Sequence, residues 1–237
     1  SLRTSSTAQL LVLVTGAGRG LGRAIANRYR DAGFTVVATD FDESSLEDIS
    51  AVEGYVTAQQ DVTDIDRAAE ISALIREQCG RLDVIVNNAG VNAFLPVSEA
   101  PPQKIIQHFM VNTFAAVIVP QACLDLLIES KGRVVNISSE SSTFRAPFQT
   151  YQSSKMALEC LSDVMRRELM FHDVHVTFIR PGAIRTDLFA GTTDMHIDAP
   201  ENSRYASIYP KLKEMVAKNI PANVSEPSEV AELVYIA

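Results

Sequence analysis

The chain has 237 residues, 46% of them apolar and 21% charged, a composition that indicates a folded globular protein and excludes a disordered or collagen-like chain. Its formal net charge of −8 has the wrong sign for a surface that binds nucleic acid or an anionic membrane, so we expect neither as a partner. Three widely spaced cysteines without a C-x-x-C motif favour a reducing compartment, and we expect a cytoplasmic protein.

Six short apolar runs, rich in β-branched residues, follow one another along the chain, and each has the pattern of a strand buried on both faces. They lie at residues 10–15, 35–39, 55–58, 84–86, 133–137 and 176–179. Segments with apolar residues three to four apart, typical of helices, separate them at 21–32, 43–50, 65–79, 103–130 and 151–171. This alternation predicts an α/β fold, namely a Rossmann-type, doubly wound parallel sheet with helices on both faces.

One uncharged stretch, residues 105–124, is long enough to span a bilayer. It also contains polar side chains and a proline, namely Gln107, His108, Asn112, Thr113, Pro120 and Gln121. We therefore expect a buried helix, with a kink or a missing backbone hydrogen bond at Pro120.

No repeat, low-complexity tract or linker interrupts the chain, so we expect one domain over residues 1–237. Residues 185–227 depart from the strand-helix rhythm, because they are long and rich in turn residues in their first part. In an open α/β sheet, such a segment is where a substrate lid is inserted. We predict a lid there, with four candidate substrate contacts: Met195, His196, Tyr205 and Tyr209.

A glycine-rich turn, T-G-A-G-R-G-L-G, follows the first predicted strand at residues 15–22. Such a turn lets the backbone approach a pyrophosphate and aims the N–H groups of a helix N-terminus at it, whereas glycines without a ligand are costly in chain entropy. The spacing fits T-G-x-x-x-G-x-G and also the looser G-x-G-x-G, which occurs in many S-adenosylmethionine methyltransferases. The turn therefore predicts a nucleotide-binding site.

Asp40 ends the second predicted strand, 18 residues after Gly22. A carboxylate there can accept hydrogen bonds from the hydroxyls of an adenosine ribose and would repel a 2′-phosphate. Phe41 and Asp42 follow it in place of a basic residue, so we expect NAD to be preferred over NADP. Arg19 favours NADP instead, because a basic residue in the glycine turn can bind a 2′-phosphate.

Tyr151 and Lys155 stand four residues apart, on one face of the predicted helix 151–171. A phenol with a pKa of about 10 is a poor base at neutral pH, and lowering that pKa by about three units takes roughly 4 kcal/mol. A nearby ammonium and a cationic nicotinamide ring could supply this stabilisation together. The pair therefore predicts a tyrosine acid/base with a lowered pKa.

Seven motifs occur along the chain in an order that is typical of one family. They are the T-G-x-x-x-G-x-G turn at 15–22, Asp61-Val62 after the third strand, Asn87-Asn88-Ala89-Gly90 after the fourth, Asn112 in the long helix, Asn136-Ile137-Ser138-Ser139 at the end of the fifth strand, Tyr151 with Lys155, and Pro181-Gly182 with Thr186 after the sixth. Over residues 10–187 the chain therefore resembles the short-chain dehydrogenase/reductase family.

The resemblance implies a nicotinamide dinucleotide, with the adenine at Asp61 and Val62 and the nicotinamide side at 181–186. The cofactor-binding residues would be Gly16, Gly18, Arg19, Gly20, Leu21, Gly22, Asp40, Phe41, Asp61, Val62, Asn88, Ala89, Gly90, Tyr151, Lys155, Pro181, Gly182, Ile184 and Thr186.

The resemblance also implies four catalytic residues, Asn112, Ser139, Tyr151 and Lys155. Tyr151 would be the general acid/base, and Lys155 would bind the nicotinamide ribose and lower the pKa of the tyrosine. A serine hydroxyl would hold the substrate oxygen, and Asn112 would order a water for proton relay.

The choice between Ser138 and Ser139 stays open at this point. The family usually has about twelve residues between the serine and the tyrosine, whereas Ser139 leaves eleven and Ser138 leaves twelve. Position relative to the strand end favours Ser139, because the strand sets the direction of its side chain and the loop at 140–150 tolerates a deletion.

We therefore expect an oxidoreductase that transfers a hydride between a nicotinamide cofactor and a secondary alcohol or ketone, without a metal. Its aromatic lid residues suggest a neutral or lipid-like alcohol. The alternatives are an S-adenosylmethionine-dependent methyltransferase and a catalytically silent dinucleotide-sensing or scaffold protein on the same fold. The resemblance further implies a homodimer or homotetramer, and a seventh strand that would follow beyond the present C-terminus.

Overall fold

The computed structural model describes residues 9–92, 96–186, 202–218 and 224–237. In them, six strands form one sheet in which every neighbouring pair is parallel, in the order β3-β2-β1-β4-β5-β6. The strands are β1 Leu11–Thr15, β2 Thr35–Asp40, β3 Tyr55–Gln59, β4 Val84–Asn87, β5 Arg133–Ile137 and β6 His175–Ile179. Successive connections run outward from β1 in one direction and from β4 in the other. The predicted doubly wound parallel sheet is thus confirmed.

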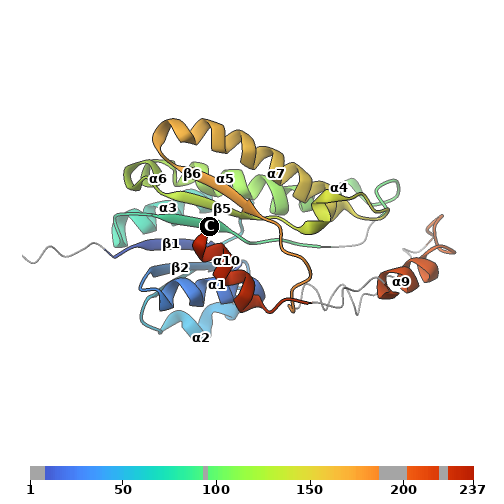
Figure 1. The fold of residues 1–237 in the computed structure, drawn as a ribbon, viewed down its shortest axis with the longest axis horizontal. Helices are drawn as coiled ribbons and strands as arrows, with labels where there is room; N and C mark the ends of the chain where they lie inside the picture. The colour runs from blue at the N-terminus through green and yellow to red at the C-terminus, as the bar shows by residue number, and fades with distance from the viewer. Residues whose placement is uncertain (1–8, 93–95, 187–201, 219–223) are drawn as a thin grey trace, which may run out of the picture.

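Helices cover both faces of this sheet (Figure 1). One face carries α1 Gly20–Asp31, the single turn α2 Glu47–Ser50 and α10 Pro227–Ile236, and the other carries α3 Ile65–Gln78, α4 Pro102–Phe109, α5 Ala115–Ala122, α6 Leu124–Ser130 and α7 Thr150–Leu169. The expected helix at 43–50 is shorter than predicted, since its first half is the 3-10 turn Glu43–Leu46.

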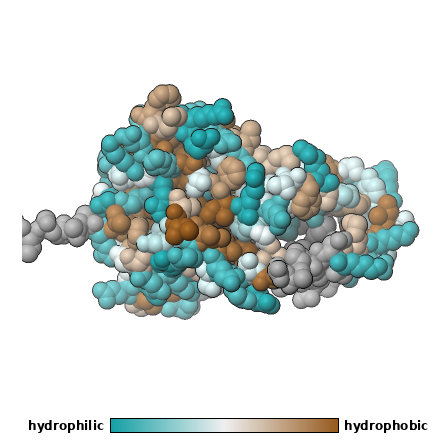
Figure 2. All heavy atoms as spheres, viewed as in Figure 1, coloured by the Kyte–Doolittle hydropathy of each residue, from teal (hydrophilic) through white to brown (hydrophobic). Residues whose placement is uncertain are grey.

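The strands divide their side chains between two apolar layers because neighbouring residues of a strand point to opposite faces. In β1, Val12 and Val14 join the layer beneath α1 and α10, while Leu11 and Leu13 join the layer beneath α3, α5 and α6. Figure 2 shows further apolar atoms at the surface around the end of α10, where Leu233 and Ile236 are exposed. The buried layers hold the strand ends, and with them the site, in a fixed arrangement.

The helix expected at 103–130 is continuous from Pro102 to Ala122, through α4, the π-helical turn Met110–Phe114 and α5, and a break at Cys123 separates it from α6. The wide turn places Asn112 and Thr113 in the interior, where both are buried. By length and composition alone, Pro102–Ala122 could cross a membrane, a test that core helices of soluble proteins also pass.

Pro120 lies inside α5 without ending it. Proline has no N–H for the carbonyl of Ala116, and the side-chain amide of Asn87 donates to that oxygen instead, at 3.5 Å. The helix is interrupted three residues later, at Cys123, whose N–H bonds back to the carbonyls of Val119 and Pro120.

The predicted lid is described only in part, and its function stays a prediction. Residues 202–218 contain α9 Tyr209–Lys218, which stands beyond the carboxyl end of the sheet (Figure 1). Ser203 donates to Glu99 at 2.7 Å, and the hydroxyls of Tyr205 and Ser98 are 2.8 Å apart, so this segment is held to the loop after β4. The predicted substrate contacts Met195 and His196 lie outside the described residues.

Candidate active site

The glycine turn between β1 and α1 closes tightly on itself. Gly16 and Gly20 have φ values of +65° and +55°, which favour glycine. A Cβ on Gly22 would overlap the carbonyl oxygen of Gly16, and one on Gly18 would overlap the side chain of Ser45. The turn therefore depends on glycine for the path of its backbone.

The N-terminus of α1 fits a bound anion. Its N-cap, Arg19, makes no side-chain cap hydrogen bond, and no acidic residue stands in the first turn, so neither a side-chain cap nor a carboxylate of that turn neutralises its first N–H groups. Leu21, which we predict to be a cofactor residue, has its side chain buried in the core, so its backbone alone can reach a ligand. The donor set and the glycine backbone suit a pyrophosphate.

The segment after β4 forms the second wall of this turn. Asn88 donates through its side-chain amide to the carbonyls of Thr15 and Gly16 at 3.0 and 3.1 Å, and the N–H groups of Asn88 and Ala89 bond to the Thr15 hydroxyl. A Cβ on Gly90 would stand 3.3 Å from Asn112 Oδ1 and 3.7 Å from Lys155 Nζ. The glycine turn and the catalytic candidates therefore meet at this segment.

The ends of β2 and β3 carry the candidates for the adenosine side. Asp40 accepts hydrogen bonds from the N–H groups of Gly18 at 2.8 Å and Asp42 at 3.1 Å, and Phe41 is exposed. Asp61 accepts from the N–H and hydroxyl of Thr63, and Val62 is buried. Arg19 is exposed, and its side chain makes no hydrogen bond or ion pair with another described residue.

Arg23 is a residue of this region that sequence reasoning missed. Its guanidinium donates to the carbonyls of Ala17 at 3.0 Å, Gly18 at 3.0 Å and Ser45 at 2.6 Å, and it pairs with Asp48. It thus holds the carbonyl side of the glycine turn. The available signal is its place in the first turn of a helix, where a positive charge is unfavourable without such partners.

Tyr151 and Lys155 stand in the first two turns of α7, beside the end of β5. Lys155 Nζ lies 5.7 Å from the centre of the Tyr151 ring and donates to the carbonyl of Ile137 at 2.7 Å. The side chain of Ser139 lies beside that of Tyr151. An ammonium has three N–H donors, and Lys155 is buried with one of them used among the described residues, so it can still bind hydroxyl groups of a ligand.

The predicted lowering of the tyrosine pKa depends on a bound nicotinamide ring and stays a prediction. In the cofactor-free protein, burial raises the pKa of Tyr151 to about 12, and the Ser139 side chain opposes this rise only in part. Burial also lowers the pKa of Lys155 to about 8. At neutral pH Tyr151 is therefore a protonated donor beside an ammonium.

Ser138 and Ser139 point to different partners. Ser138 is buried and donates to Glu159 at 2.6 Å. Ser139 lies beside Tyr151 and accepts from the N–H and hydroxyl of Ser141 at 3.2 and 2.9 Å. The geometry therefore favours the argument from the strand end over the argument from residue counting.

Asn112 uses its side chain within the protein. Its Oδ1 accepts from the N–H of Val91 at 2.8 Å, and its Nδ2 donates to the carbonyl of Val91 and to the hydroxyl of Ser154. Ser154 in turn donates to the carbonyl of Tyr151. Asn112 thus links the segment after β4 to α7, and its ordering of a water stays a prediction.

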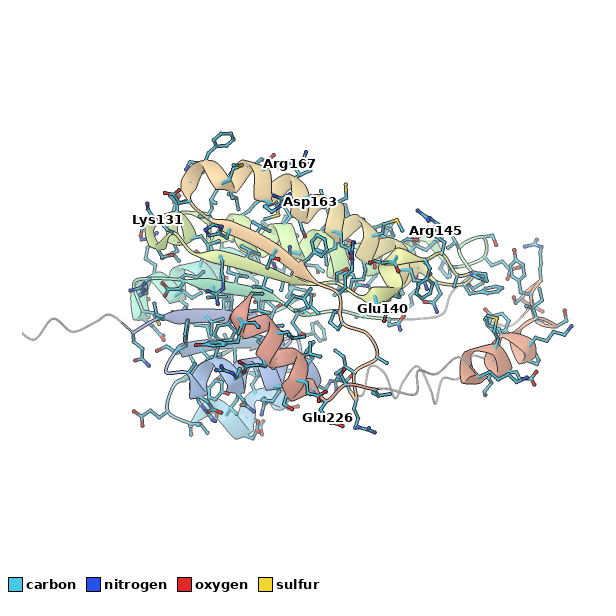
Figure 3. The ribbon with its side chains drawn as sticks, viewed as in Figure 1. Lys131, Glu140, Arg145, Asp163, Arg167 and Glu226 are labelled. Carbon is cyan, nitrogen blue, oxygen red and sulfur yellow. The ribbon has the colours of Figure 1, made fainter. Side chains whose placement is uncertain are left out.

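The loop after β6 closes the site from the other side. Pro181 is buried, and its carbonyl accepts from the N–H of Glu140, which lies at the end of the sheet near the start of α7 (Figure 3). Ile184 pairs with Ser225 in an isolated bridge, and Thr186 approaches Gly20 of the glycine turn. The predicted nicotinamide-side residues and the glycine turn therefore border one site.

Comparisons with known proteins agree with this geometry. Residues 10–196 match the short chain dehydrogenase family. The NADPH-dependent 3-dehydrocapnine reductase of Ornithobacterium rhinotracheale is 32% identical, over 86% of this chain and 75% of the relative. The NADPH-dependent 1-acyldihydroxyacetone phosphate reductase of Schizosaccharomyces pombe is 31% identical, over 90% of this chain and 73% of the relative.

A solved short-chain dehydrogenase from Streptomyces avermitilis superimposes with a TM-score of 0.81 at 29% identity, covering 98% of this chain and 84% of that one. These matches favour a dehydrogenase over the methyltransferase that the looser glycine pattern allowed. From the matched length, the similarity of sequence and the shared architecture, we conclude that this chain belongs to the short-chain dehydrogenase family.

Proposed function

We propose that the protein interconverts a secondary alcohol and its ketone with a nicotinamide cofactor, and that Tyr151 is the general acid/base. One observation carries this proposal: Tyr151 lies beside Ser139, with its ring centre 5.7 Å from the ammonium of Lys155, at the same edge of the sheet as the uncapped N-terminus of α1. The nicotinamide supplies or accepts the hydride. The residues of the chain must therefore move one proton and stabilise one oxygen.

In the direction of reduction, Tyr151 donates its phenolic proton to the substrate oxygen while Ser139 donates a hydrogen bond to the same oxygen. Its raised pKa keeps the phenol protonated at neutral pH, which suits a proton donor. In the direction of oxidation, Tyr151 must accept the alcohol proton, and the charge of Lys155 stabilises the phenolate. Lys155 also binds the ribose next to the nicotinamide with its free N–H donors.

We propose that the backbone of the glycine turn binds the pyrophosphate, that Asp61 and Val62 border the adenine, and that 181–186 border the nicotinamide. We further propose a preference for NAD. Asp40 is held by the N–H of Gly18 at 2.8 Å, so its negative charge stays next to the glycine turn and disfavours a 2′-phosphate. Two relatives are named as NADPH-dependent, and Arg19 is the residue through which this chain would bind NADP.

For the substrate, we propose a small neutral or lipid-like alcohol or ketone. Phe148 packs against Tyr205 and Tyr209 with ring centres 5.2 and 5.6 Å apart, which supports an apolar wall on the substrate side. Reductases are among the relatives; one is named for an acylated substrate that also carries a phosphate, so it supports the lipid-like character and not the neutral charge. We also propose a cytoplasmic homodimer or homotetramer.

The decisive experiment follows NADH and NADPH absorbance over a panel of secondary alcohols and ketones, and then repeats the best reaction with Tyr151→Phe. We expect kcat to fall by about 10²–10⁴-fold, because the proton donor is lost while the ring remains. The dissociation constant of the cofactor, measured by fluorescence, should stay within about threefold.

Undiminished turnover of Tyr151→Phe would overturn the proposed mechanism. No turnover of any alcohol or ketone, combined with tight nicotinamide binding, would instead favour a dinucleotide-sensing protein on the same fold. Binding of S-adenosylmethionine without nicotinamide binding would contradict the proposal altogether.

A further inference from the structure

One buried carboxylate on α7 collects four hydrogen bonds. Glu159 accepts from the hydroxyl of Ser138 at 2.6 Å, from that of Ser142 at 2.6 Å, and from Nε and Nη2 of Arg180 at 2.9 and 2.7 Å. These partners come from the two ends of the turn after β5 and from the end of β6. Glu159 is 9% exposed and both serines are buried, so the two hydroxyl bonds are shielded from water, whereas the Arg180 side chain reaches the carboxylate from the surface.

Glu159 continues the catalytic face of the helix. It follows Lys155 by four residues and Tyr151 by eight, a spacing that puts all three on one side of α7. Each of these three side chains lies against one of three successive residues at the end of β5. The carbonyl of Ile137 accepts from Lys155, the hydroxyl of Ser138 donates to Glu159, and the side chain of Ser139 lies beside Tyr151.

Arg180 connects the same face of α7 to the loop after β6, which we propose to border the nicotinamide. Arg180 directly precedes Pro181, and backbone bonds from Ser138 to Ile179 and from Glu140 to Pro181 join the two strand ends, at 2.8 and 2.9 Å. The bidentate ion pair with Glu159 therefore fastens the end of β6 to the same helix face.

The carboxylate is ionised in this setting. Burial acts to raise the pKa of Glu159, but the hydrogen bonds from Arg180, Ser138 and Ser142 outweigh it and hold the pKa below its usual value. A neutral amide in its place keeps one acceptor oxygen but turns an NH2 group toward the Arg180 guanidinium, which would lose its bidentate, charged partner.

We propose that Glu159 is a positioning residue for turnover: it holds the turn 138–142 and the end of β6 so that the Ser139 hydroxyl stays against Tyr151. This inference rests on the proposed function. Glu159 touches neither of the groups that would react, so its effect on the rate must pass through Ser139. A carboxylate that merely stabilised the fold would affect turnover in the same way whether or not Ser139 is present.

The test is a double-mutant cycle of Glu159→Gln and Ser139→Ala, followed by kcat. We expect Glu159→Gln to lower kcat by about tenfold or more in the wild-type background and by less than about twofold in the Ser139→Ala background. The matched control is Asp163→Asn, one turn further along α7, where an exposed carboxylate pairs with Arg166 (Figure 3). It should leave kcat unchanged.

Ser142→Ala is the second variant, because it removes one donor from Glu159 without leaving a buried charge unpaired. It should lower kcat several-fold with Ser139 present and have little effect without it. Hydrogen exchange of the cofactor-free protein gives a readout apart from activity. The amides of 138–144 and 179–182 should exchange faster in Glu159→Gln than in Asp163→Asn.

An equal loss of kcat in both backgrounds, no loss at all, or unchanged exchange in 138–144 would overturn the inference. Failure of the proposed function has a different signature, since turnover would then survive Tyr151→Phe while the exchange experiment still reports on the turn.

Discussion

The two halves of the carboxyl edge of the sheet contribute different kinds of chemical group to the site. Beside β1, β2 and β3, the site is mostly backbone: glycines at Gly16, Gly18 and Gly22 and the open N–H groups of α1. Beside β4, β5 and β6, it is a network of buried side chains centred on α7. A site made of backbone groups requires glycine at fixed positions along the chain. A site made of side chains requires residues that are far apart in the sequence to contact one another, with their charges paired.

The side-chain half should carry a stability cost that depends on pH. Burial lowers the pKa of Lys155 from 10.5 to about 8, so the unfolded chain binds this proton more tightly than the folded one. Below pH 8 the cost is about 3 kcal/mol at roughly 1.4 kcal/mol per pH unit, and it disappears as the pH rises to 10.5. Lys155→Met lacks this cost.

We therefore expect the free energy of unfolding of the wild type, relative to Lys155→Met, to rise by about 2 kcal/mol between pH 7 and pH 9.5 in urea denaturation. Lys131→Met is the control, because Lys131 is exposed and paired with Asp173, which raises its pKa. Its difference from the wild type should stay constant over this range. If the difference in free energy of unfolding between the wild type and Lys155→Met does not change with pH, the predicted cost of burying the Lys155 ammonium is wrong.

In the half made of backbone groups, we expect the addition of a single methyl group to weaken cofactor binding. Gly22→Ala places a Cβ on the carbonyl oxygen of Gly16, and such overpacking costs about 1–3 kcal/mol. We expect the cofactor to bind about 10–100-fold more weakly in a fluorescence titration. Gly33→Ala is the matched control, because Gly33 has a φ of +89° but open space around it. It should lower stability and leave cofactor binding as it is.

Asp40 is the exception in the backbone half, since it acts through a side chain. Asp40→Ala removes the charge next to Gly18, and we expect the ratio of the NADPH and NADH dissociation constants to fall by about tenfold, or about 1.4 kcal/mol. Asp42→Asn, two residues away, keeps its capping oxygen and should change the ratio by less than twofold. If the ratio of the two dissociation constants is the same for Asp40→Ala and the wild type, Asp40 does not determine the preference between NAD and NADP.

The strands could be predicted from the sequence almost to the residue, because buried parallel strands are continuous apolar runs between turns. The expected strand at 133–137 is the observed β5, and that at 176–179 differs from β6 by one residue. The π-helical turn at Met110–Phe114 could not be predicted, since it depends on Asn112 bonding to Val91 and Ser154 from two other parts of the chain.

In the site, the glycine turn and the pair of Tyr151 and Lys155 follow from spacing alone. The raised pKa of Tyr151 in the cofactor-free protein could not be predicted, because it depends on how deeply the fold buries the phenol. Glu159 was missed although a signal exists: a carboxylate four residues after Lys155, on the helix face that meets the sheet, needs buried partners. Their identity required the fold.

The end of β5 shows that the distance between serine and tyrosine is set across space, by strand against helix, and not along the chain. Residues 143–149, beyond the turn held by Glu159, can therefore gain or lose length with the proposed proton-transfer groups in place, so the count back from Tyr151 does not by itself identify the serine. Within this loop, Phe148 adopts a φ of 63° and directs its ring to Tyr205 and Tyr209. The loop is thus a segment in which substrate preference can evolve, or be engineered, while the proton-transfer groups stay in place.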